Sequence, residues 1–247
     1  MGVGIEIMTF AETLIIGSTS GIGLAISNEL TKRKHKIFSI SRSSMDEAHL
    51  SDLRQHYVAD CTFFEDVTVV FKEMKRMGFS PTSIVCTVGS GGIRLNNRLN
   101  QWETNLSVNL FSVVNVVDAA MDWFSENLRN IVVISSISGV GAFLDPPIEY
   151  SVAKAALNHY IKIKSLELAR SGICLNAIAP GNILYPGSSW DKRLQLNSDS
   201  VEQYINANVP LKKFGTPEDI AKVVCMVVEE NSYMTGQILV CDGGQSL

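Results

Sequence analysis

The sequence has few cysteines, and no two of them are spaced as metal ligands or as a redox pair. Five occur in 247 residues, and they are Cys61, Cys86, Cys174, Cys225 and Cys241. An odd number without C-x-x-C or neighbouring histidine spacing excludes a disulfide framework and a zinc site of the usual pattern. We therefore expect buried thiols in a reducing compartment, a cytoplasmic location and no metal.

The sequence also lacks an excess of positive charge and a membrane-length apolar run. Lys and Arg number 21 against 25 Asp and Glu, so the formal net charge is -4. Nucleic acid is an unexpected partner, because its binding needs a basic surface. Uncharged stretches such as 130–144 are broken by Ser and Gly, and residues 1–10 lack a basic region followed by a long apolar run. We expect neither a membrane span nor an export signal.

Short β-branched or apolar runs alternate along the chain with longer segments of helical period. This alternation predicts repeated βαβ units, and therefore an α/β fold with helices on both faces of a mostly parallel sheet. The seven expected strands are 13–16, 36–40, 57–59, 83–87, 130–135, 174–178 and 237–240.

Four segments between these strands have the spacing of amphipathic helices. They are 22–33, 106–124, 148–170 and 217–229, the last with Thr216 as N-cap and Pro217 in the first turn. No linker or repeat divides the chain, so we predict one domain over residues 1–247. Residues 181–197 are rich in Gly, Ser and Asn and predict a long loop or lid, and we place a substrate lid at about 182–212.

A glycine-rich turn joins the first expected strand to the first expected helix. Its spacing is G-x-x-x-G-x-G, and glycines allow backbone N–H groups and a helix N-terminus to approach a pyrophosphate. Glycines also occur in tight βα connections without any ligand. The strand and helix on either side favour nucleotide binding, with these candidate contacts: Gly17, Ser18, Thr19, Ser20, Gly21, Ile22 and Gly23.

The end of the second expected strand carries Ser41 and Arg42, where dinucleotide-binding folds usually place an acidic residue for the ribose hydroxyls. An arginine without a carboxylate suits a ribose that carries a 2′-phosphate. We therefore predict NADP(H) in preference to NAD(H). The alternatives are that Arg42 is a solvated loop charge and that Asp46 or Glu47 reaches the ribose.

Tyr150 and Lys154 are four residues apart at the start of an expected helix, so both side chains lie on one face. A neighbouring ammonium favours the phenolate, so we expect Lys154 to lower the pKa of Tyr150 and allow proton exchange with a substrate oxygen. Ser135 and Ser136 end the fifth expected strand, at the sheet edge where open α/β folds bind ligands. Taken singly, these residues also fit a packing Tyr, a surface Lys and strand-end hydroxyls.

Together these motifs resemble the classical short-chain dehydrogenase/reductase family over residues 13–244. The resemblance implies a doubly wound Rossmann-type domain and a catalytic set of Asn109, Ser136, Tyr150 and Lys154. It also implies that Ile183 contacts the nicotinamide carboxamide and that Asp60 contacts adenine. The further cofactor contacts expected from it are Cys61, Gly89, Tyr150, Lys154, Pro180 and Gly181.

Three positions depart from the family pattern. Residues 86–89 read Cys-Thr-Val-Gly where the family has N-N-A-G, so the asparagines that brace the sheet are absent. Tyr185 stands near the place of a threonine that contacts the cofactor, and Ile16 replaces a threonine before the glycine turn. None of these changes removes a catalytic group.

The resemblance implies an NADP(H)-dependent oxidoreductase that transfers a hydride between nicotinamide and a ketone or secondary alcohol. Tyr150 would exchange the proton, Ser136 would hold the substrate oxygen, Lys154 would hold the ribose, and Asn109 would hold a water. A 3-oxoacyl-(acyl carrier protein) reductase is one form of this activity, and a reductase of sugars or nucleotide-linked sugars is another. A cofactor-binding regulatory protein without turnover is an alternative of another class. An epimerase or dehydratase of the extended branch shares the Tyr-x-x-x-Lys spacing, but such enzymes usually carry G-x-x-G-x-x-G, which differs from the glycine spacing here.

Substrate and assembly follow less directly from the residues. Lys192 and Arg193, in the expected lid, either meet an anionic substrate or form a solvated charged loop. The family resemblance implies a homodimer or homotetramer that pairs through the helices 106–124 and 148–170.

Overall fold

The protein is built around one seven-stranded sheet, seen in a computed structural model that describes residues 11–247. The strand order is β3-β2-β1-β4-β5-β6-β7, and every neighbouring pair is parallel, so the sheet has no antiparallel edge. The strands are β1 (Glu12–Ile16), β2 (Lys36–Ser41), β3 (Arg54–Val58), β4 (Ser83–Cys86), β5 (Asn130–Ile134), β6 (Cys174–Pro180) and β7 (Ile238–Cys241).

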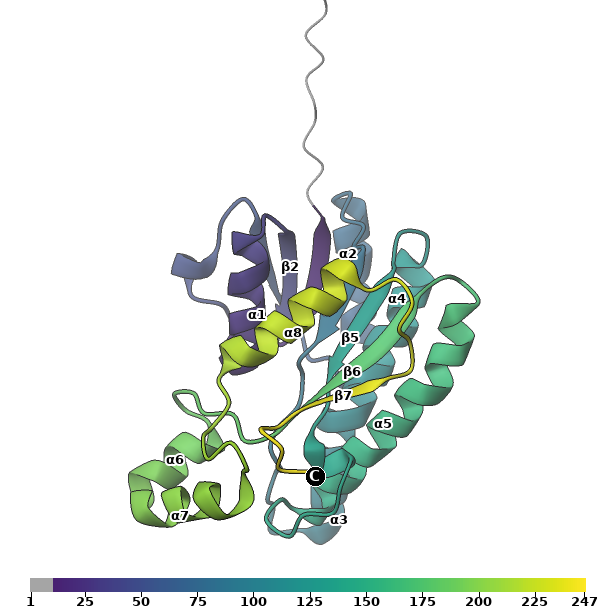
Figure 1. Cartoon of the computed structure of the whole chain (residues 1–247). Helices are drawn as coiled ribbons and strands as arrows, with labels where there is room; N and C mark the ends of the chain where they lie inside the picture. The colour runs from purple at the N-terminus through teal and green to yellow at the C-terminus, as the bar shows by residue number, and fades with distance from the viewer. Residues whose placement is uncertain (1–10) are drawn as a thin grey trace, which may run out of the picture.

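Helices cover both faces of this sheet, as the alternation of strands and helices predicted (Figure 1). On one face α1 (Gly21–Lys32) packs against α8 (Pro217–Glu230), and the other face carries α2 (Phe64–Arg76), α4 (Ser112–Phe124) and α5 (Ile148–Ala169). Successive residues of a strand point to opposite faces of the sheet and therefore belong to two separate apolar cores. In β1, Leu14 and Ile16 lie in one core and Ile15 lies in the other. Burial on both sides explains why the central strands are continuous apolar runs.

The third strand begins three residues earlier than predicted, at Arg54 rather than Tyr57. Its first residues, Arg54, Gln55 and His56, are polar and carry no apolar alternation. Pairing with β2 places Arg54 opposite Ile37 and therefore extends the strand. The predicted range 57–59 therefore covers only the end of β3, because hydrogen bonding to β2, rather than hydrophobicity, defines where this edge strand starts.

The stripe over 106–124 is helical but not one regular helix. α3 (Arg98–Leu106) passes into a π-helical turn, η2 (Ser107–Phe111), before α4 begins. A π turn inserts an extra residue into the helical repeat and often marks a functional position. Here it contains Asn109.

The expected loop over 181–197 is present up to residue 188, but a helix begins at Ser189, so that prediction was wrong for its second half. The segment 182–212 contains α6 (Ser189–Leu196) and α7 (Ser198–Asn208), which lie together beside the sheet edge (Figure 1). Ser188 and Asn197 accept hydrogen bonds from Asp191 N and Ser200 N as N-caps. Their turn-forming character therefore starts helices here.

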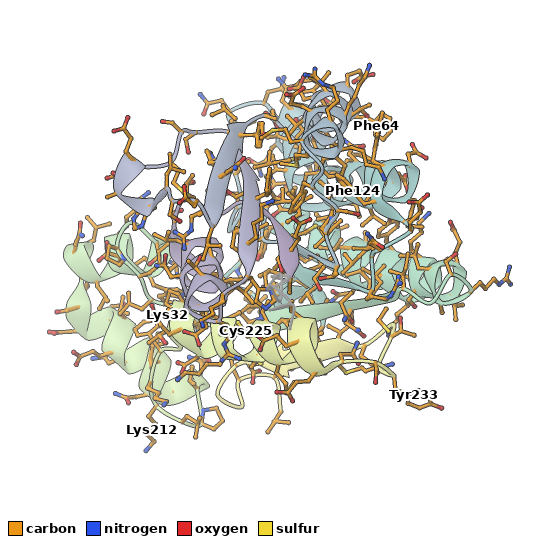
Figure 2. All side chains as sticks on the ribbon, turned by 90° about the horizontal axis from the view of Figure 1, so that it is seen from above. Lys32, Phe64, Phe124, Lys212, Cys225 and Tyr233 are labelled. Carbon is orange, nitrogen blue, oxygen red and sulfur yellow. The ribbon has the colours of Figure 1, made fainter. Side chains whose placement is uncertain are left out.

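The helix boundaries predicted elsewhere are close to those observed. α8 begins after Thr216, whose hydroxyl and the Asp219 carboxylate form a reciprocal capping box. Apolar side chains fill the interior, and most charged ones lie at the surface. Phe124 is buried, whereas Tyr233 and Lys212 point outward in Figure 2. All five cysteines are free thiols, and within residues 11–247 no helix has the length and apolar character of a membrane span.

Candidate functional site

A cavity of about 830 Å³ opens at the carboxyl ends of the parallel strands. The turns after β1, β2, β4, β5 and β6 all contribute to it, because parallel strands end at the same sheet edge. Most predicted site residues line it: Gly17, Thr19, Ser20, Ile22, Gly23, Ser41, Arg42, Asp60, Cys61, Gly89, Ser136, Tyr150, Lys154, Pro180, Gly181 and Ile183. The lining does not include Ser18, Gly21 and Asn109.

The glycine turn after β1 leaves no room for side chains at two of its glycines. Gly17 has φ +92°, and a Cβ on Gly23 would lie 1.9 Å from the Gly17 carbonyl oxygen. Such an approach of helix to strand end is possible only for glycine. The turn therefore presents bare backbone to the cavity, which suits a phosphate group.

Thr87 supports this turn in the place of the missing asparagines. Its hydroxyl lies 2.8 Å from the Ile16 carbonyl oxygen and 2.7 Å from that of Gly17, so it donates to the end of β1 from the end of β4. From the sequence alone, residues 86–89 only lack the asparagines that would brace the sheet. The structure shows that a hydroxyl on the neighbouring strand supplies a brace.

At the far end of the cavity, Ser41 ends β2 and Arg42 follows it. Ser41 Oγ accepts a hydrogen bond from Ser18 N at 3.1 Å, while Arg42 is exposed and lines the cavity. The alternative acidic residue Asp46 instead accepts from Ala48 N and caps the short η1 turn (Glu47–His49), and neither it nor Glu47 lines the cavity. This arrangement leaves Arg42 as the charged side chain at that end of β2.

Lys154 is a buried ammonium at the base of the cavity. Its side chain is 3% exposed, and Nζ donates to the Ile134 carbonyl oxygen at 3.0 Å. Burial lowers the pKa of Lys154 from 10.5 to about 8. The ammonium lies 6.0 Å from the centre of the Tyr150 ring, one helical turn away on α5.

The net pKa shift of Tyr150 is opposite to the one expected from the sequence. Burial raises the pKa of the Tyr150 phenol, the Ser136 hydroxyl beside it lowers this pKa, and Tyr185 raises it further. The prediction took account of the positive charge of Lys154 but not of the loss of water around the phenol. In this structure Tyr150 is therefore held in its neutral form, which can donate a proton.

Asn109 and Lys154 meet at Gly89. A Cβ on Gly89 would lie 3.0 Å from Asn109 Oδ1 and 3.2 Å from Lys154 Nζ. Asn109 Oδ1 accepts from Ser90 N at 2.9 Å, and its Nδ2 donates to the Asn105 carbonyl oxygen at 3.1 Å. The π turn thus orients a buried amide toward the buried ammonium.

The helical lid adds an aromatic wall that no motif predicted. Trp190 packs against Tyr204 and Phe214, with ring centres 5.2 and 5.4 Å apart. Arg193 stacks on Trp190 and pairs with Asp145 at 2.9 Å, so its charge is engaged within the chain. This wall could not be predicted from the sequence, because the positions of the aromatic residues along the chain do not show that α6, α7 and the loop after them are in contact.

Tyr185 covers part of the glycine turn. A Cβ on Gly21 would lie 2.6 Å from the Tyr185 ring, and this contact explains why Gly21 does not line the cavity. Cys61 lines the cavity as a largely buried thiol, whose pKa burial raises to about 12. It is therefore an unreactive, protonated group at this place.

The chain is similar to known proteins over nearly its whole length. Residues 16–246 match the family described as enoyl-(acyl carrier protein) reductase. The chain is 31% identical over 243 residues to carbonyl reductase family member 4 of Xenopus tropicalis, covering 94% of this chain and 97% of that protein. It is 30% identical over 237 residues to the 3-oxoacyl-[acyl-carrier-protein] reductase FabG of Rickettsia bellii, covering 94% and 95%.

Solved structures share the whole architecture. ElxO with NADP bound has a TM-score of 0.83 at 26% identity, covering 96% of this chain and 99% of that one. A short chain dehydrogenase from Leptospira borgpetersenii with bound NAD+ has a TM-score of 0.85 at 21% identity, covering 97% and 94%. The second likeness shows the fold alone.

Proposed function

Because this chain belongs to the classical short-chain dehydrogenase/reductase family, we propose that it is an NADP(H)-dependent reductase of ketones that uses Tyr150 as its proton donor. The oxidoreductase class follows from the family itself. The choice of NADP(H), the roles of individual residues and the substrate are our proposals. The observation that carries them is the meeting of Ser136, Tyr150 and Lys154 at the base of one cavity with the bare glycine turn at its side.

The cavity fits a nicotinamide dinucleotide along the strand ends. The glycine turn would hold the pyrophosphate, Asp60 the adenine, and Ile183 the carboxamide, as the family resemblance implies. When bound, the nicotinamide supplies or accepts the hydride. The side chains of the protein position the carbonyl group of the substrate and supply the proton.

In the reductive direction the phenol of Tyr150 donates its proton to the carbonyl oxygen as that oxygen gains charge. The Ser136 hydroxyl donates a hydrogen bond to the same oxygen and fixes its position. Lys154 holds the ribose and, as an ammonium, stabilises the phenolate that Tyr150 leaves behind. Asn109, next to Lys154 at Gly89, holds a water through which Lys154 exchanges protons with solvent.

Arg42 supports the choice of NADP(H). It is the charged residue at the end of β2 that lines the cavity, and its guanidinium can form two charge-assisted hydrogen bonds with a 2′-phosphate. The bound NADP in the similar ElxO structure is consistent with this choice.

The decisive experiment compares the wild type with Tyr150→Phe in NADPH oxidation with a ketone. We expect loss of turnover with unchanged NADPH binding, because the substitution removes only the hydroxyl. Equal activity in the two proteins would refute the assignment of Tyr150. NADPH binding without turnover by the wild type, over a panel of ketones, would favour a regulatory role.

For the substrate we propose a 3-oxoacyl thioester. The support is the similarity to 3-oxoacyl-[acyl-carrier-protein] reductases such as that of Rickettsia bellii, together with a cavity that continues past Tyr150 to the aromatic wall. A screen of acetoacetyl thioesters against sugars and small cyclic ketones tests this choice. Preference for a sugar would overturn it.

We also propose a homo-oligomer that pairs through α4 and α5. Apolar side chains stand exposed on α5 and on the π turn that precedes α4, such as Phe111 at 50%, Ile163 at 58% and Leu166 at 70%. Covering them would remove a large apolar area from water. A monomeric mass in light scattering would contradict the proposal.

A further inference from the structure

A second cavity, of about 340 Å³, lies at the opposite edge of the sheet from the site described above. Its wall comes from the C-terminal half of α1, the η1 turn and the start of β3. The two cavities share no lining residue. The residues lining the second cavity are Asn28, Thr31, Lys32, Ala48, His49, Leu50, Ser51 and Arg54.

Arg54 differs from the other residues of this wall, because its guanidinium is buried and, among residues 11–247, has no carboxylate as a partner. The residue is 4% exposed. Nη2 donates to Asn28 Oδ1 at 3.0 Å and to Thr31 Oγ1 at 2.9 Å, so both of its partners are neutral. Within residues 11–247, Nε is buried with no hydrogen-bond partner and no carboxylate forms an ion pair with the guanidinium.

A buried guanidinium normally needs a paired anion, because the loss of water around the charge is costly. Burial accordingly lowers the pKa of Arg54, with no carboxylate to oppose it. The nearby acidic side chains have other partners or face solvent: Asp46 caps the η1 turn, Glu29 pairs with Arg33 and Lys32, and Asp52 is exposed on the turn before β3. Among residues 11–247, none of them forms an ion pair with Arg54.

We propose that this cavity binds a phosphate group, held by Arg54 with Lys32 and His49 around it. Nη2 is already engaged by Asn28 and Thr31, so the charge of the guanidinium and its unpartnered Nε–H are what favour an anion here. Lys32 lines the cavity with a side chain that is 76% exposed, and its surface pair with Glu29 at 3.8 Å is weak enough for an anion in the cavity to compete for the ammonium. The volume exceeds that of a bare phosphate, so both inorganic phosphate and a small phosphate monoester are accommodated.

The experiment follows the Nε–H resonance of Arg54 by NMR while inorganic phosphate is added. A buried Nε–H exchanges slowly and gives a separate peak, which is assigned by its disappearance in Arg54→Lys. We expect a saturable shift that sodium chloride at equal ionic strength does not produce. Lys32→Ala should weaken phosphate binding by about fivefold, as expected for loss of one neighbouring charge.

Two matched variants separate this site from other phosphate binding. Lys72→Ala removes an exposed lysine elsewhere and should leave the titration unchanged, as should Arg42→Ala at the larger cavity. The same titration with glycerol phosphate shows whether the site takes a phosphate monoester or inorganic phosphate. Tighter binding of glycerol phosphate than of inorganic phosphate identifies a monoester, and equal or weaker binding identifies the free anion. No shift with phosphate, or an equal shift with chloride, would overturn the proposal.

Discussion

The buried ammonium of Lys154 should make the stability of this protein depend on pH in a way that one substitution removes. The pKa of Lys154 is about 8 in the native state and 10.5 in its ordinary state. Between these values the unfolded chain binds more protons than the native protein, so the free energy of unfolding rises with pH. Lys154→Met keeps the length of the side chain and cannot titrate.

The size of the effect follows from the shift, at about 1.4 kcal/mol for each pKa unit. The full shift corresponds to about 3 kcal/mol, of which about 2 kcal/mol falls between about pH 7 and about pH 9.5. The difference in unfolding free energy, wild type minus Lys154→Met, should therefore grow by about 2 kcal/mol over that interval. Other titrating groups are common to both proteins and cancel in this difference.

Urea unfolding followed by circular dichroism, at several pH values, measures this difference directly. The matched control is Lys72→Met, which removes an exposed lysine on α2 and should give a difference that stays flat with pH. A flat difference for Lys154→Met as well would refute the assignment of a depressed pKa to Lys154. A difference that falls with pH would mean that the native site favours the ammonium.

Two further predictions concern the two ends of the larger cavity. Arg42→Asp should shift the cofactor preference from NADPH toward NADH, because a carboxylate repels the 2′-phosphate and accepts from ribose hydroxyls; an unchanged ratio of the two kcat/KM values would count against Arg42. Thr87→Val should lower the free energy of unfolding by about 1–3 kcal/mol and weaken cofactor binding, since the end of β1 loses its hydroxyl donor. Thr87→Ser keeps that hydroxyl and should retain most of the stability, so equal losses in both variants would show that the methyl group matters instead.

Local patterns in the sequence determined the architecture of this protein. The apolar runs of β1, β4, β5 and β6 are continuous because both faces of these strands are buried, and their helical connections require parallel pairing. The glycine turn, Ser136 and the Tyr150–Lys154 pair lie next to strand ends or at a helix start. Their meeting at one sheet edge therefore follows from strand direction alone.

Other features were decided by contacts between distant segments. Arg54 belongs to β3 because it pairs with β2, and Thr87 braces β1 from the end of β4. The net pKa shift of Tyr150 also depends on burial by surrounding elements, which neighbours in sequence do not reveal. Such properties depend on which groups lose water and which find partners, and these are set only when the chain packs.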